Sequence, residues 1–128
     1  MLVKDVMVKD VATISPFATL REAMSLMKRH NLKSLVVEKN GPSDAYGLIT
    51  YTNIVKTVIA ESGDIDLLNV YDVCAKPTLT VGESLAVRHV ASLMTQNRIK
   101  RILVVNDNDL IGLVTMDDIV DILLQEVE

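Results

Sequence analysis

The chain repeats itself, and this repeat limits its fold more than any other feature. Thr13 matches Thr80, a shift of 80 − 13 = 67 positions, and the shift drops to 112 − 47 = 65 once Gly47 matches Gly112. The change falls in a stretch rich in Gly, Pro, Ser, Asn and Asp, where loop length is free to vary. Matches that keep their order and break once, in a loop, indicate two copies of one structural unit. Further matches are Asp5-Val6 with Asp72-Val73, Ser25-Leu26-Met27 with Ser92-Leu93-Met94, and Ile54-Val55 with Ile119-Val120.

Each copy has the pattern of a β-α-β-β-α unit. In the first, Thr19 and Glu22 have the T-x-x-E spacing of a helix capping box, and apolar residues follow at helical spacing. We predict an α+β fold with one copy at residues 1–62, a connecting segment at 63–71 and a second copy at 72–128. Copies of roughly 55 residues are near the lower limit for an independent core, so we expect both to pack into one compact pseudo-symmetric module with a cleft between them. The expected elements are Val11–Ile14, a helix from Thr19, Leu35–Val37, Tyr46–Thr50 and Asn53–Glu61, then Thr78–Val81, Ser84–Gln96, Ile102–Val105, Leu110–Thr115 and Asp118–Glu126.

Composition narrows the class of protein. The 128 residues are 49% hydrophobic and carry a net charge of −4, which argues against a general nucleic-acid binder. Cys74 is the only cysteine, and no apolar run approaches the roughly 20 residues of a membrane span. The amino-terminal residues lack the apolar centre of a signal peptide. We therefore expect a cytoplasmic protein that is not bound to a membrane.

Several motifs, taken in order, resemble those of the CBS domain over essentially the whole chain. The first copy has Val3-Lys4-Asp5-Val6-Met7 and then Thr13-Ile14-Ser15-Pro16 followed by Thr19-Leu20-Arg21-Glu22-Ala23. The second copy ends in Gly112-Leu113-Val114-Thr115-Met116-Asp117-Asp118. Two departures stand out: Gly82-Glu83 replaces Ser15-Pro16, and Asn53 stands where the family usually has Asp.

The resemblance implies a non-enzymatic regulatory module that senses cellular energy by binding AMP, ADP or ATP between the repeats, with no cofactor required. It also implies a homodimer formed through helical faces. The output would pass to an unknown effector protein in trans. Two alternatives stay open: a dimerising interaction module that uses no nucleotide, and a binder of S-adenosylmethionine.

The turn from strand to helix at Thr115 and Asp118 is the predicted centre of the site. A helix N-terminus favours anions, and a carboxylate accepts the paired hydroxyls of a ribose. The resemblance gives Asp118 the ribose and the Thr115 hydroxyl the phosphate. Taken alone, Thr-x-x-Asp is more typical of a capping box without any ligand, and only the resemblance favours a site. Thr50 and Asn53 are the equivalent pair, and we expect that site to be weaker because the amide nitrogen of Asn53 only donates.

The remaining predicted site residues are cations and strand residues near these turns. Arg101 suits bidentate phosphate binding, and Lys33 and Lys100 act as point charges. Ser34 is the equivalent of Arg101. The resemblance places the first strands at the base or phosphate and apolar side chains along the adenine, although such side chains are often ordinary core. These strand residues are Thr13, Ile14, Ser15, Leu35, Thr80, Val81 and Ile102.

Overall fold

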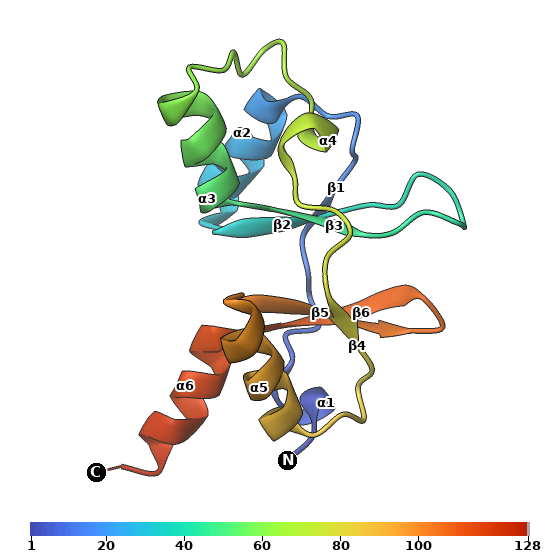
Figure 1. The fold of residues 1–128 in the computed structure, drawn as a ribbon, viewed down its shortest axis with the longest axis vertical. Helices are drawn as coiled ribbons and strands as arrows, with labels where there is room; N and C mark the ends of the chain where they lie inside the picture. The colour runs from blue at the N-terminus through green and yellow to red at the C-terminus, as the bar shows by residue number, and fades with distance from the viewer. Residues whose placement is uncertain (128) are drawn as a thin grey trace. The chain divides into compact units, whose positions relative to one another are not determined.

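The computed structural model describes residues 1–127, which form two compact units (Figure 1). One unit is the continuous stretch 12–78. The other combines residues 1–11 with residues from 79 onward. Each unit has one three-stranded sheet with its helices on one face (Figure 1). Within residues 1–127, no helix is both long and apolar enough to cross a membrane.

The continuous unit is built on a sheet of order β1-β2-β3. Strand β1 runs parallel to β2, and β2 pairs antiparallel with β3. The Thr19 hydroxyl accepts the Glu22 N–H and the Glu22 carboxylate accepts the Thr19 N–H, so the predicted capping box is present. Its elements are β1 (Thr13–Ile14), α2 (Leu20–His30), β2 (Ser34–Val37), β3 (Gly47–Thr50), α3 (Tyr51–Ile54), the π-helical η1 (Val55–Ala60) and α4 (Val70–Val73).

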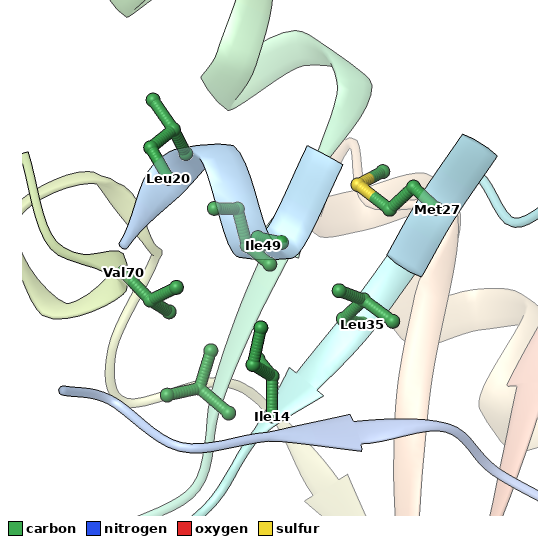
Figure 2. Packing of buried hydrophobic residues seen from close by; sticks show 8 residues of the cluster. Ile14, Leu20, Met27, Leu35, Ile49 and Val70 are labelled. Carbon is green, nitrogen blue, oxygen red and sulfur yellow. The ribbon is translucent and has the colours of Figure 1, made fainter. Parts of the chain in front are cut away.

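An aliphatic core holds α2 and α4 against this sheet. Leu20, Leu35, Ile49 and Val70 are fully buried, and they meet on the helix-covered face of the sheet (Figure 2). Burying a side chain of this size contributes about 1.5–3 kcal/mol, so these contacts account for much of the unit's stability.

The discontinuous unit repeats this plan with the order β4-β5-β6. Strand β4 is parallel to β5, and β5 is antiparallel to β6. Its core contains Val3, Val90, Met94, Ile102 and Val114, each fully buried. Its elements are α1 (Val3–Val6), β4 (Thr80–Val81), α5 (Val87–Asn97), β5 (Arg101–Asn106), β6 (Asp109–Thr115) and α6 (Met116–Gln125).

The two units exchange short segments relative to the sequence repeat. We call residues 1–7 and 68–74 the exchanged segments. Residues 1–7 begin the first copy but pack with the sheet of the second, while residues 68–74 pack with the sheet of the first. The hydrogen bonds are equivalent: Leu20 N–H donates to Leu68 O at 2.8 Å, and Val87 N–H donates to Met1 O at 3.0 Å. Each exchanged segment therefore provides an acceptor for the otherwise unpaired N–H groups at a helix N-terminus.

The α+β class and the β-α-β-β-α order of each copy are confirmed. The predicted helix 53–61 instead begins at Tyr51 and changes to π-helical geometry at Val55. The helix predicted from Ser84 begins at Val87, because no side chain caps it and Ala86 is still extended. The four-residue helices α1 and α4 were not predicted, since they are too short to show helical periodicity.

Candidate functional site

The turn between β6 and α6 holds Thr115 and Asp118 in a reciprocal capping box. Thr115 N–H donates to Asp118 Oδ2 at 2.9 Å, and Asp118 N–H donates to Thr115 Oγ1 at 3.1 Å. The capping role is therefore real, and it fixes the orientation of the carboxylate. Asp118 Oδ1 receives no hydrogen bond from residues 1–127, so one carboxylate oxygen stays available for a ligand.

The cationic residues of the second copy lie beside this turn. Arg101 is directly opposite Thr115 in the β5–β6 ladder, and Met116 N–H donates to Lys100 O at 2.8 Å. Arg101 is half-buried, Lys100 is exposed, and neither forms an ion pair with another described residue. Four residues from two distant parts of the sequence therefore form one polar group. We call it the Asp118 group: Lys100, Arg101, Thr115 and Asp118.

The first copy has the same geometry with different chemistry. Ser34 lies opposite Thr50, and Tyr51 N–H donates to Lys33 O at 3.2 Å. Asn53 Oδ1 accepts from both the N–H of Thr50 at 2.9 Å and its hydroxyl at 3.0 Å. The cap therefore occupies the acceptor end of Asn53 and leaves its amino group, a donor, for any ligand. The expectation that Asn53 holds a ribose less well than Asp118 stays a prediction.

In each unit, the predicted site residues of the first strand, β1 or β4, do not lie beside the polar turn between the last strand and its helix. Thr13 pairs with Val36, so Ser15 lies level with Glu38, four residues along the strand from Ser34. At about 3.3 Å per residue this separation is roughly 13 Å. The Thr13 hydroxyl donates to Glu38 at 3.0 Å, a contact that sequence patterns did not indicate. Thr80 and Val81 pair with Leu103 and Val104 in the same way. The predicted residues of each unit therefore form two separate groups.

The four apolar residues expected beside adenine are core residues. Leu35 and Ile102 are 0% exposed, Ile14 is 8% exposed and Val81 is 9% exposed, and each packs in the hydrophobic cluster of its own unit. In this structure, neither Leu35 nor Ile102 has any surface exposed to a ligand. Their part in binding stays a prediction.

The single cysteine of the chain, Cys74, is partly buried. Burial raises the pKa of the Cys74 thiol, so it stays protonated at neutral pH and is a poor nucleophile. Within residues 1–127, no three His, Cys, Asp or Glu side chains are grouped so that they could hold a metal ion.

Two sheets, each with capped helices on one face and a polar strand-to-helix turn, define a tandem α+β repeat protein. The model of the CBS domain matches the chain twice, at residues 3–60 and 70–125. The chain belongs to the CBS-domain family, and it contains a tandem pair of these domains.

Similar proteins extend from small CBS proteins to large enzymes. CBS domain-containing protein YhcV of Bacillus subtilis is 32% identical over 91% of this chain and 81% of its own length. Uncharacterized protein MK0525 of Methanopyrus kandleri is 34% identical, and the alignment covers 89% of this chain but 58% of that protein. An inosine-5'-monophosphate dehydrogenase of Methanocaldococcus jannaschii is 34% identical over 90% of this chain, which spans only 22% of the enzyme.

Solved structures share the fold over almost the whole chain. A hexameric CBS-CP12 protein from bloom-forming cyanobacteria is 36% identical with a TM-score of 0.89, covering 94% of this chain and 71% of that one. The CBS domain pair of protein MJ0100, in complex with 5'-methylthioadenosine and S-adenosyl-L-methionine, is 26% identical with a TM-score of 0.85. That match covers 98% of both chains.

Proposed function

We propose that this CBS pair is a regulatory module that binds an adenine nucleotide through the Asp118 group. The observation that carries the proposal is the carboxylate of Asp118, which is fixed by its cap yet keeps Oδ1 available beside Arg101 and Lys100. That oxygen accepts one ribose hydroxyl, and a remaining lone pair on Oδ2 accepts the other. The first turn of α6 has the N–H groups and the partial positive charge that favour a phosphate.

The complex of protein MJ0100 supports an adenosine-containing ligand in a similar fold. That complex contains S-adenosyl-L-methionine, which makes this sulfonium compound the second candidate ligand here. Lys100 and Arg101 favour a nucleotide, because phosphate attracts cations and a sulfonium repels them. We propose AMP, ADP or ATP as ligand, regulation of an effector protein in trans, and no enzymatic activity for the chain itself.

Calorimetric titration tests the choice of ligand. Wild-type protein should bind at least one of AMP, ADP and ATP more tightly than S-adenosylmethionine. Replacing Arg101 by alanine should weaken ATP binding about tenfold, because a charge-assisted contact to phosphate is lost, while adenosine binding changes little. Equal losses for ATP and adenosine would exclude a phosphate contact. A heat signal for S-adenosylmethionine alone would favour the second candidate.

We further propose that the chain forms a homodimer through its second helices. On α6, Leu123 and Leu124 are 59% and 62% exposed, and on η1, Val55 and Ile59 are 56% and 73% exposed. Exposed apolar residues on a helix are typical of protein contact surfaces. Sedimentation at micromolar concentration should give a dimer, and Leu123→Asp together with Ile59→Asp should give a monomer. A monomeric wild-type protein would contradict the proposed dimer contact through these helices.

A further inference from the structure

A hollow in the continuous unit is lined by none of the residues assigned to nucleotide, although one of them, Ser15, accepts a hydrogen bond from Phe17 N–H at 3.1 Å. Its volume is about 430 Å³, within the range of small binding pockets. Two aromatic rings stand at its edge, Phe17 and Tyr71, with centroids 6.1 Å apart in an edge-to-face arrangement. They are 61% and 52% exposed, in a chain with only four aromatic residues. The lining residues are Pro16, Phe17, Asn40, Ser43, Asp44, Tyr71 and Lys76.

The aromatic pair has no counterpart in the other copy, although the backbone there is equivalent. Tyr71 N–H donates to Pro16 O at 3.0 Å, and at the matching place Lys4 N–H donates to Glu83 O at 2.9 Å. At the shift of 67, Ser84 is the equivalent of Phe17 and Lys4 that of Tyr71. The same backbone therefore forms with Ser and Lys, so its geometry does not require the two rings.

A second feature found only in this copy completes the hollow. Nine residues, 38–46, separate the paired Val37 and Gly47, whereas seven, 105–111, separate the equivalent Val104 and Gly112. Asp44 ties the longer loop to the rest of the unit, because its carboxylate accepts from Lys76 Nζ at 2.6 Å and from Asn40 N–H at 2.7 Å.

The polar groups of the hollow leave mainly donors for a ligand. The hydrogen bonds from Lys76 and from the Asn40 and Ala45 N–H groups lower the pKa of Asp44 to about 2, so this carboxylate stays ionised and already bonded at neutral pH. Lys76 keeps two of its three ammonium hydrogens. The Tyr71 hydroxyl, Asn40 amide and Ser43 hydroxyl form no side-chain hydrogen bond with residues 1–127, and each of them can donate.

Exposed rings beside free donors are suited to one kind of peptide in particular. A proline-rich segment adopts the polyproline II conformation, in which the pyrrolidine rings pack on aromatic side chains. Its proline residues have carbonyl acceptors and no N–H groups, so it needs donors from its partner. The polyproline II conformation of such a segment is preformed, so binding does not have to order a flexible chain. Proline carries no charge, so binding needs no oppositely charged residues in the hollow.

From these observations we infer that the hollow bounded by Phe17, Tyr71 and the 38–46 loop binds a proline-rich peptide segment of a partner protein. The rings receive the prolines, and Tyr71, Asn40, Ser43 and Lys76 donate to the carbonyl groups of the peptide. The inference does not rest on the proposed nucleotide binding, so a failure of either proposal leaves the other standing.

Titrating the ¹⁵N-labelled full chain with a blocked decaproline peptide tests the inference by nuclear magnetic resonance. Amide signals of Phe17, of residues 40–46 other than Pro42, and of residues 71–76 should shift and saturate with a dissociation constant below about 1 mM. A blocked Gly-Ser peptide of equal length should cause no saturable shifts. Failure of decaproline to give saturable shifts at several millimolar, or saturation at other residues, would overturn the inference.

The second copy provides a matched variant. Phe17→Ser combined with Tyr71→Lys introduces the residues that occupy the equivalent positions 84 and 4, so the fold should be retained and the spectrum away from the hollow unchanged. Decaproline affinity should fall at least tenfold. Tyr51→Ala removes another exposed ring, one outside the hollow, and should leave the affinity unchanged. Unchanged affinity in the double variant would contradict the assignment of the hollow.

Discussion

Replacing Val3 by alanine should lower the free energy of unfolding by roughly 2 kcal/mol, although Val3 lies near the chain terminus. Terminal residues usually tolerate change, but this side chain is 0% exposed and belongs to the core that it forms with residues between Val81 and Ile119. Hydrogen exchange measured by mass spectrometry should show protection lost first in residues 79–127. The loss should be weaker in residues 12–78, which carry the first copy's strands.

Val70→Ala is the matched control, because Val70 is the equivalent residue and is also 0% exposed. Its effect should fall on residues 12–78 instead. If Val3→Ala loosened residues 12–78 first, or if both variants gave one common pattern, the exchange of segments would be contradicted.

Replacing Asp118 by asparagine should weaken nucleotide binding at least tenfold, a loss of about 1.4 kcal/mol. Asparagine keeps a carbonyl oxygen for the Thr115 N–H, so the cap and the helix should survive, as the Thr50–Asn53 cap does. What disappears is the second acceptor, since the amino group of asparagine repels a hydroxyl hydrogen. Calorimetry with the tightest nucleotide, with thermal unfolding as a check of the fold, measures this effect.

Asn53→Asp is the reciprocal change in the same chain. It restores a carboxylate at the equivalent cap and should keep or increase nucleotide binding. Equal affinity in wild type and in Asp118→Asn would remove Asp118 from the ribose contact. A similar loss in both variants would point to a general effect on helix starts.

The sequence predicted the elements well because each has a local signal. Thr19 and Glu22 predict a capping box, and the structure has one. The turn residues between Val37 and Gly47 predict a loop at the point where the repeat shift changes. The predicted equivalence of Ser34 and Arg101 is seen in the strand registers, which bring Ser34 opposite Thr50 and Arg101 opposite Thr115.

The exchange of segments could not be predicted, because Val3 and Val70 have nearly the same local sequence and each fits either core. Periodicity identifies a side chain that is buried, but it does not identify the sheet that buries it. The hollow at Phe17 and Tyr71 was missed for a related reason. These two residues are 54 positions apart, and neither belongs to a motif. The two extra residues in the 38–46 loop indicated a difference in length between the copies, but not a hollow.

The exchanged segments also have an implication for how such a protein arose by gene duplication. A single ancestral copy, beginning like residue 1 and ending near residue 67, would have one leading segment as the counterpart of residues 68–74, which now complete the first core. Two such polypeptides could complete each other by trading their leading ends. Fusion of the duplicated genes would then have joined in one polypeptide two copies that had associated by this exchange.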